Sequence, residues 1–481
     1  MAAAEEMLVV ARKDGEEEPS IDTDKLSYEI FSILESKFLF GYDDRSLWLP
    51  KLPQSGALQA AASADVDAAA AFKSQRGKVC ILSIDGGGGI GMRGILPGKA
   101  LAYLEQALRS KSGDPDARIS DYFDLAAGTG VGGFFAAMLF ATHDGSRPAY
   151  RADETWRFLA NSGRRIYRKP SSSSSGAQSR SAFLRCVLRS YGGYGLVETS
   201  TKAMERAMKD TFGESLTLRD TVKPLLIPCY DIRSSGPLVF SRADALESES
   251  YDFRLWEVCR ATWAEPGRFE PVEMRSVDSS TVCFGVDGGI AMSNPTAAAI
   301  THVLHNKQEF PFVRGVEDLM VLSLGCGAPS SIVVPEAASG HLEYQNLRQW
   351  GAKEWARPLA RIASDGTADL VDHAVALAFG QSRSTSYVRI QANETSIRPC
   401  RTDVDCDPSP ANVEVLLSLA EEMLKQKNVE SQLFGGRQIC EQTNMEKLDW
   451  FAGELILEHQ RRSCRIAPTV VFRQTVSNSN R

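Results

Sequence analysis

The most constraining feature of this sequence is a glycine-rich turn between two apolar segments. Residues 126–133 read AAGTGVGG, with DYFDL before them and FFAAMLF after them. This pattern is typical of a sharp turn from a buried strand into a helix, which many hydrolases use to present a serine in Gly-x-Ser-x-Gly. Here the central position is Gly130, which has no side chain. The turn is therefore predicted to form without its usual nucleophile.

Apolar segments of strand and helix character alternate along the chain from residue 78 onward. The expected strands are KVCILSI, FDLAA, PLLIPCYDI, PLVFS, STVCFGVD, DLMVLSLG and TSYVRIQ. The expected helices between them include LPGKALAYLEQALRS, VGGFFAAMLFATH, TKAMERAMKDTF and NPTAAAITHVLH. Such alternation predicts an α/β fold with a mainly parallel central sheet and helices on both of its faces.

Composition divides the chain into three parts. Residues 1–77 contain a Glu-rich start that we expect to be disordered, a helical pattern from Ser20 or Asp22, and an Ala-rich linker. Residues 78–395 carry the alternating pattern, and residues 396–481 are helical in character. We therefore expect one α/β domain with a helical extension at each end.

Charge and composition exclude several classes of protein. The chain has 481 residues and a net charge of −7, which argues against a nucleic-acid binder. Its start lacks the basic residues and long apolar stretch of a secretory signal, and no segment reaches the ~18 apolar residues of a spanning helix. The cysteines form no Cys-x-x-Cys pair. We expect a reduced, cytoplasmic protein with no cofactor and no metal.

A second glycine-rich segment, SIDGGGGIGMRGILPG at residues 83–98, follows the first expected strand. Its backbone N–H groups can converge on an anion, and the helix that follows adds partial positive charge. Residues 89–94 also satisfy G-x-G-x-x-G, but the later strand ending in an acid that dinucleotide sites need is missing. An oxyanion hole facing the turn at Gly130 fits better, and phosphate or dinucleotide binding is the alternative.

The third segment, GVDGGIAMSNPTAAA at residues 285–299, places Asp287 at the end of an expected strand, before two glycines. The strand ends of a parallel sheet share one edge, where ligands usually bind. Asp287 is therefore expected beside the turn at Gly130. No histidine stands in a comparable motif, so we expect an aspartate as the general base.

These three segments, in this order, resemble the patatin-like family of lipid acyl hydrolases. The family pattern is a D-G-G-G-x-R-G oxyanion loop, a G-x-S-x-G turn and a D-G-[AG] aspartate that forms a Ser–Asp dyad. The resemblance runs from about Lys78 to Gln391, supported by ISDYFDLAAGT, CRATWAEPGRFEP, VDGGIAMSNP and VLSLGCG. It implies a three-layer α/β/α fold.

The resemblance also assigns roles to individual residues. The oxyanion-loop roles fall on Gly86, Gly87, Gly88 and Arg93. The base falls on Asp287 and the nucleophile position on Gly130. The loop carries GIGM before its arginine where the family has a single residue, so its register differs from the family pattern. Glycine at the nucleophile position resembles a plant branch of the family, often called group III, whose members are described as lipid acyl hydrolases.

Replacing the serine by glycine leaves two functional hypotheses. Glycine relieves backbone strain of about 1–3 kcal/mol in such a turn but removes covalent acyl chemistry. Water deprotonated by Asp287 would replace the serine hydroxyl, and Thr129 is a second substitute. We expect either a weak, non-standard hydrolase of phospholipid or galactolipid esters, or a catalytically inactive lipid-binding or scaffolding protein on the same fold. Either would contact membrane lipids peripherally.

An acidic segment at residues 403–414, DVDCDPSPANVE, resembles a calcium-binding loop in its spacing of carboxylates. Pro408 stands where the sharp turn of such a loop requires glycine. We therefore expect an acidic loop that caps the next helix at Ser409.

A segment rich in tryptophan and basic residues, RQWGAKEWARPLARIASDG, spans residues 348–366. Packing of Trp350 and Trp355 against the core is one interpretation. The other is a helix that lies in a membrane interface. Exposure of both tryptophan side chains in the structure would favour the membrane interpretation.

Overall fold

A computed structural model of the chain describes residues 77–86, 91–167, 182–327, 350–380, 383–392, 404–431 and 437–463, together with Arg348 and Val470. The chain divides into two compact units. One consists of Met1–Ala70 with Arg465–Pro468, and the other of Ala71–Cys464 with Thr469–Arg481. Every residue described below belongs to the second unit. The helix expected from Ser20 or Asp22 lies outside the described residues.

A central sheet organises this unit. Its strands are β1 (Val79–Ile84), β2 (Leu125–Gly128), β3 (Leu225–Asp231), β4 (Gly236–Ser241), β5 (Val272–Arg275), β6 (Val282–Val286), β7 (Leu319–Leu324) and β8 (Tyr387–Ile390). They follow the order β5-β6-β3-β2-β1-β7-β8, and β4 pairs with β3. The pairs among β3, β2, β1, β7 and β8 are parallel, whereas β4, β5 and β6 pair antiparallel.

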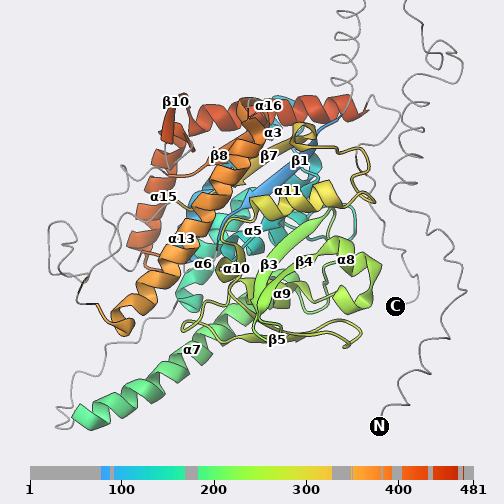
Figure 1. Cartoon of the computed structure of the whole chain (residues 1–481). Helices are drawn as coiled ribbons and strands as arrows, with labels where there is room; N and C mark the ends of the chain where they lie inside the picture. The colour runs from blue at the N-terminus through green and yellow to red at the C-terminus, as the bar shows by residue number, and fades with distance from the viewer. Residues whose placement is uncertain are drawn as a thin grey trace, which may run out of the picture. The chain divides into compact units, whose positions relative to one another are not determined.

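Helices cover both faces of the sheet (Figure 1). The α-helices are α3 (Ile95–Ser112), α4 (Ile119–Tyr122), α5 (Val131–Phe140), α6 (Ala152–Ile166), α7 (Ala182–Phe212), α8 (Arg242–Glu247), α9 (Leu255–Thr262), α10 (Gly288–Met292), α11 (Thr296–His305), α13 (Ala352–Phe379), α14 (Arg383–Ser386), α15 (Pro410–Lys425) and α16 (Asn444–Ser463). Short 3-10 helices are η2 (Gly91–Gly94), η3 (Glu249–Tyr251) and η4 (Val316–Asp318).

Side chains alternate between two hydrophobic cores, as the period of a strand requires. Cys80 and Leu82 of β1 belong to the core shared with α3, α5, α9, α15 and α16. Val79 and Ile81 belong to the core shared with α11 and α13. The protein therefore has the three-layer α/β/α fold expected from the sequence, and every expected strand forms.

The part of the chain after residue 404 packs onto the α/β core. Ser409 caps α15 by accepting a hydrogen bond from the Asn412 amide, as expected. Between α15 and α16 lies an antiparallel hairpin, β9 (Lys427–Ser431) and β10 (Arg437–Thr443), which the helical expectation missed. In α16, the Arg462 guanidinium donates two 2.6 Å hydrogen bonds to the Asp124 carboxylate. This contact holds the last helix against the start of β2. The expected domain boundaries at residues 77 and 395 stay predictions.

Candidate active site

The turn between β2 and α5 has the geometry expected of a nucleophile elbow. Gly130 has φ +54° and ψ −123°, a backbone conformation that a residue with a side chain adopts only under strain. The first turn of α5 follows directly, and its amides have no acceptor within the helix. The turn therefore presents partial positive charge beside a backbone position with no side chain.

Two buried threonine hydroxyls hold the turn. The Gly130 amide donates a 2.9 Å hydrogen bond to Thr262 Oγ1, which donates in turn to the Pro228 carbonyl oxygen at 2.6 Å. The Thr129 hydroxyl donates a 2.6 Å hydrogen bond to the Met292 carbonyl oxygen. Both threonines are fully buried. The turn is thus fixed to the end of α9, to β3 and to α10.

Asp287 lies where β6 ends and α10 begins. It is the N-cap residue of α10, is 2% exposed, and accepts a 2.9 Å hydrogen bond from the Gly289 amide. A Cβ atom on the next residue, Gly288, would lie 2.3 Å from the Pro228 carbonyl oxygen and 2.5 Å from Thr262 Oγ1. Only glycine permits so close an approach. The aspartate segment therefore packs directly on the threonine that holds Gly130.

The sequence analysis expected Asp287 beside Gly130 because the ends of parallel strands share one edge of the sheet. This reason is wrong, because β6 does not run parallel to the central strands. It pairs antiparallel with the part of β3 that extends beyond β2, with Val286 opposite Tyr230. In the neighbouring pair, Ala127 of β2 lies opposite Leu226. Continuing both registers brings Thr129 and Gly288 to the level of Pro228. β2 and β6 run in opposite directions, and the chain leaves both strands beside Pro228 of β3.

The expected oxyanion loop begins at the end of β1, close to the same point. The Thr129 amide donates a 3.2 Å hydrogen bond to the Ile84 carbonyl oxygen. The Gly86 amide donates to the Ser293 carbonyl oxygen at 3.2 Å, so this N–H is directed to the end of α10. Gly87 and Gly88 lie outside the described residues.

Arg93, in η2, is held by a segment that the sequence analysis did not connect with the loop. Its guanidinium forms an ion pair with Asp405 and donates a 2.9 Å hydrogen bond to the Gly327 carbonyl oxygen. The Met92 amide donates to the Asp405 carbonyl oxygen at 2.8 Å. Burial alone lowers the pKa of Arg93, but the Asp405 carboxylate outweighs burial and raises it. The acidic segment thus supports the glycine loop.

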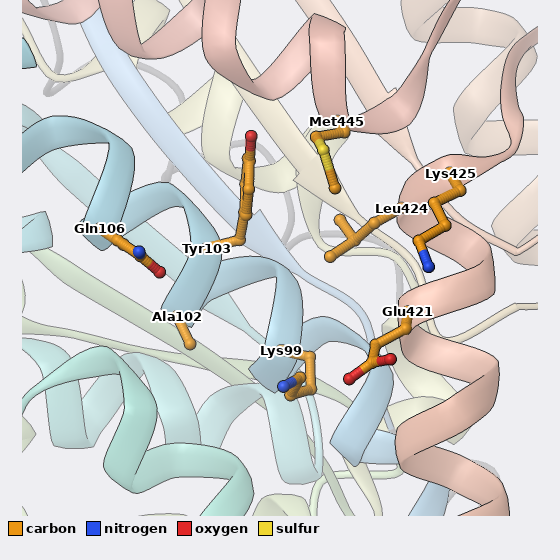
Figure 2. A pocket seen from close by; sticks show the side chains of 8 residues that line it. All are labelled: Lys99, Ala102, Tyr103, Gln106, Glu421, Leu424, Lys425 and Met445. Atoms are coloured by element: carbon orange, nitrogen blue, oxygen red, sulfur yellow. The ribbon is translucent and has the colours of Figure 1, made fainter. Parts of the chain in front are cut away.

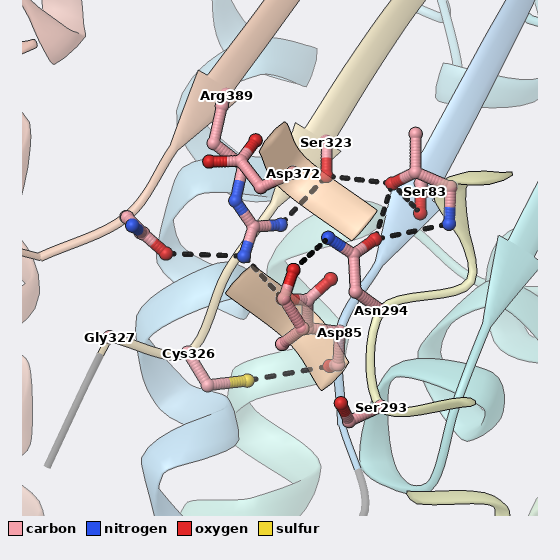
Figure 3. A network of polar contacts seen from close by, with 12 residues as sticks. Ser83, Asp85, Ser293, Asn294, Ser323, Cys326, Gly327, Asp372 and Arg389 are labelled. Atoms are coloured by element: carbon pink, nitrogen blue, oxygen red, sulfur yellow. Dashed lines mark hydrogen bonds and ion pairs between the residues drawn. The ribbon is translucent and has the colours of Figure 1, made fainter. Parts of the chain in front are cut away.

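A buried polar network joins β1, β7 and β8 around Asp85, the residue before Gly86 (Figure 3). Arg389 of β8 forms an ion pair with Asp85 at 2.5 Å and donates a 2.7 Å hydrogen bond to Ser323 Oγ. Burial lowers the pKa of Arg389, but the carboxylates of Asp85 and Asp372 outweigh it and raise the pKa. The aspartate that precedes the glycine loop is therefore fixed by a residue 304 positions away in the sequence and two strands away in the sheet.

A surface pocket of about 310 Å³ lies apart from this arrangement (Figure 2). Its lining comes from α3, α15 and the start of α16, and includes Lys99, Tyr103, Glu421 and Lys425. None of its lining residues is an expected site residue. Within the described part of the chain, no group of three or more His, Cys, Asp or Glu side chains could hold a metal ion.

The fold and this site define a three-layer α/β protein in which a glycine turn meets a buried aspartate. The sequence profile of the patatin-like phospholipase family matches residues 82–300. Patatin-like protein 6 of Arabidopsis thaliana is 60% identical over 466 residues, which cover 95% of this chain and 89% of that protein. Patatin-like protein 7 of the same plant is 60% identical over 464 residues, covering 96% and 87%. The chain belongs to the patatin-like family.

Proteins of this family are in general lipid acyl hydrolases, enzymes of lipid metabolism that act on lipid substrates. A more distant relative is named Probable inactive patatin-like protein 9, also from Arabidopsis thaliana. It is 41% identical over 383 residues, which cover 79% of this chain and 86% of that protein.

The sequence analysis missed three residues that organise the site. Thr262 lies inside the segment CRATWAEPGRFEP, which supported the family resemblance but suggested no contact with Gly130. Ser293 follows Asp287 by six positions and carries no motif of its own. Asp405 was interpreted only as part of an acidic loop. Each contacts a partner more than a hundred positions away, so no local pattern could identify it.

Proposed function

We propose that this protein hydrolyses acyl esters of phospholipid or galactolipid and releases free fatty acid, with a water molecule in place of the missing serine. One observation carries the proposal: Asp287 and Gly130 flank the same buried threonine, because Thr262 contacts both segments. The segment that carries Asp287 and the turn with no side chain therefore pack on the same side chain. We propose that a water molecule takes the place of the absent hydroxymethyl group.

In the proposed reaction Asp287 first accepts a proton and later donates it. Asp287 takes a proton from water as the water oxygen attacks the ester carbonyl carbon, and the carbonyl oxygen becomes an oxyanion. Backbone amides of the glycine loop, at Gly87 and Gly88, and of the first turn of α5 stabilise this charge. The carbon–oxygen bond to the lipid then breaks, and the leaving oxygen receives the proton from Asp287. The products are a fatty acid and a lysolipid.

Thr129 is a weaker choice of nucleophile than water. Its hydroxyl donates to the Met292 carbonyl oxygen at 2.6 Å and is fully buried. Breaking this hydrogen bond would separate the buried Thr129 hydroxyl from the carbonyl of half-buried Met292, at a cost of about 1 kcal/mol. Arg93 is proposed to position the loop through Asp405 and Gly327, since its guanidinium is bound to both.

A second function, lipid binding or scaffolding without catalysis, is favoured by Gly130 itself. An elbow with no hydroxyl cannot form an acyl-enzyme, and a 41% identical relative is named as probably inactive. In this alternative the same site binds the lipid ester but does not cleave it. In both cases we propose a cytoplasmic protein that contacts membranes peripherally. The free thiols of the cysteines in the described residues support a reducing compartment.

The test is fatty-acid release by the purified full chain from phosphatidylcholine and from monogalactosyldiacylglycerol, measured by mass spectrometry. Asp287→Asn keeps the side-chain oxygen that accepts from Gly289 but removes the base. We expect it to reduce release by about 10²-fold or more. Asp153→Asn, a change at a half-exposed position on α6, is the control and is expected to leave release unchanged. Equal release from wild type and Asp287→Asn would reject the hydrolase.

A further inference from the structure

Helix α13 carries a stripe of apolar residues on its solvent side. Its large members are Trp355, Leu370 and Leu377, which are 37%, 68% and 54% exposed. The small residues Ala363, Gly366 and Ala374 lie between them and are also exposed. At 100° per residue, the six positions fall within an arc of about 100°. We call these six residues the α13 stripe.

The opposite side of α13 is fixed to the domain, so the stripe is a built surface. Val375, Ala376 and Phe379 are buried in the core shared with α11. Ser364 and Asp372 are buried on the same side. Figure 1 shows α13 as a long helix along the outside of the sheet. With 1.5 Å per residue, Trp355 and Leu377 lie about 33 Å apart along the helix.

The stripe ends in a tryptophan pair at the start of the helix. Trp350 and Trp355 have ring centroids 5.1 Å apart, in an edge-to-face arrangement. Trp355 is exposed and Trp350 is half-buried, so the criterion that both tryptophans be exposed is not met, and only Trp355 belongs to the stripe. Tryptophan is enriched where proteins meet the polar–apolar boundary of a bilayer.

On the side opposite the stripe, helix α13 contacts the candidate active site through Ser293. Ser293 Oγ donates a 2.7 Å hydrogen bond to the Ser364 carbonyl oxygen of α13. The Ser293 carbonyl oxygen accepts the amide of Gly86, the first glycine of the proposed oxyanion loop. Ser293 also ends α10, the helix that begins at Asp287. The helix that carries the stripe therefore packs against the elements that form the site.

We propose that the α13 stripe docks the protein onto a lipid surface of neutral headgroups. The inference rests on the proposed function in one respect: the docked surface supplies the ester lipid of that site. Large exposed apolar surfaces with polar borders mark contact sites, and an amphipathic helix of this kind lies flat in a membrane interface. The exposed carboxylate of Asp369 borders the stripe, and the chain carries a net charge of −7. An anionic surface would repel both.

The test is co-sedimentation of the full chain with vesicles of phosphatidylcholine alone and of phosphatidylcholine mixed with phosphatidylglycerol. We expect binding to phosphatidylcholine, and weaker binding when phosphatidylglycerol is present. The double variant Leu370→Gln/Leu377→Gln replaces two exposed side chains with polar ones of good helix propensity. It is expected to bind phosphatidylcholine at least tenfold less tightly, because each buried leucine contributes roughly tenfold in affinity.

The matched control is Val415→Gln/Leu457→Gln, which changes two exposed apolar residues on α15 and α16. It is expected to bind as the wild type does. Equal loss in the control and stripe variants would overturn the proposal, as would stronger binding with phosphatidylglycerol. Light scattering provides a further outcome: a wild-type dimer that the stripe variant converts to monomer would assign the stripe to a second copy of this chain.

Vesicle binding and hydrolysis separate this inference from the proposed function. If the chain releases no fatty acid but binds vesicles through the stripe, the hydrolase fails and the docking surface stands. Hydrolysis of a soluble short-chain ester should be unchanged in the stripe variant, since that substrate needs no surface. Normal vesicle binding by the stripe variant would reject the docking surface and leave the hydrolase intact.

Discussion

The amide nitrogen of Gly130 lies 2.9 Å from the hydroxyl oxygen of Thr262, and this hydroxyl donates onward to the Pro228 carbonyl oxygen. One side chain thus satisfies a donor from the elbow and an acceptor from β3, both in the buried interior. The same oxygen faces Gly288, beside Asp287. Thr262 is therefore the link that joins the two halves of the candidate site.

Thr262→Val tests this link, because valine has the same shape but no hydroxyl. The Gly130 amide and the Pro228 carbonyl would both lose their partner, so we expect the free energy of unfolding to fall by about 2–4 kcal/mol. Urea denaturation measures the change. Thr301→Val, on the exposed side of α11, is the control, with an expected change within about 0.5 kcal/mol. Similar losses in the two variants would show that the Thr262 hydroxyl is unimportant.

Gly130→Ser is expected to create a nucleophile at the elbow. A serine hydroxyl beside Asp287 should react with a fluorophosphonate probe, whereas residue 130 of the wild type has no atom that the probe can label. Gly130→Ala is the matched control, because it imposes the same positive φ on a side chain without a hydroxyl. Both variants should lose about 1–3 kcal/mol of stability.

Labelling is read by mass spectrometry of the peptide that contains residue 130. We expect it in Gly130→Ser alone, and we expect it to disappear when Asp287→Asn is added. If Gly130→Ser labels no more than Gly130→Ala, the turn does not present residue 130 to the site as we propose.

Asp405→Ala is expected to destabilise the protein by about 3 kcal/mol, since it leaves the Arg93 guanidinium largely buried without its carboxylate. Replacing both partners, as in Arg93→Met/Asp405→Ala, should cost less than the sum of the single changes Arg93→Met and Asp405→Ala. Chemical denaturation of the three variants completes the cycle. The exposed pair of Arg275 and Glu273 serves as control, and Glu273→Ala should change stability by less than about 1 kcal/mol. Additive losses at Arg93 and Asp405 would contradict the coupling.

His302 makes the stability depend on pH. Burial and, to a smaller extent, the charge of His305 lower the pKa of His302 to about 4. Its value in the unfolded chain is about 6.5, so between these values the unfolded state binds the extra proton. The contribution of neutral His302 to the free energy of unfolding is complete above pH 6.5 and is lost as the pH falls toward 4.

From pH 7.5 to pH 5, this histidine should account for about 2 kcal/mol of the loss of stability. His302→Gln does not titrate, so the slope of stability against pH should decrease by that amount. Urea denaturation at the two pH values measures the slope. His143→Gln, at an exposed position, is the control. An unchanged slope in His302→Gln would show that this side chain is not the titrating group.

Local patterns predicted much of the architecture. Short apolar runs bounded by turns became strands, and the segments with helical period became helices, from α3 to α16. The missed hairpin of β9 and β10 shows the limit of this method. Apolar and polar residues alternate only weakly in β9 and β10, and these two strands pair with each other. A two-stranded hairpin depends on the surrounding structure for its stability.

The candidate site was predicted in part, because three of its segments carry glycine patterns that a single sequence reveals. Their neighbours carry none. Arg93 and Asp405 are 312 positions apart, and Gly130 and Thr262 are 132 apart. No periodicity in the sequence relates such residues, since their contact depends on the order of strands in the sheet.

The sequence by itself determined the alternation of strands and helices, the turn at Gly130 and the absence of any hydroxyl there. These depend on backbone conformation and on the chemistry of single residues, which are local properties. Only the tertiary structure decided that β6 runs antiparallel and so delivers Asp287 to Thr262. It also decided which side of α13 faces solvent. Both depend on packing between distant segments, where burial of apolar surface selects one arrangement from many that the local patterns permit.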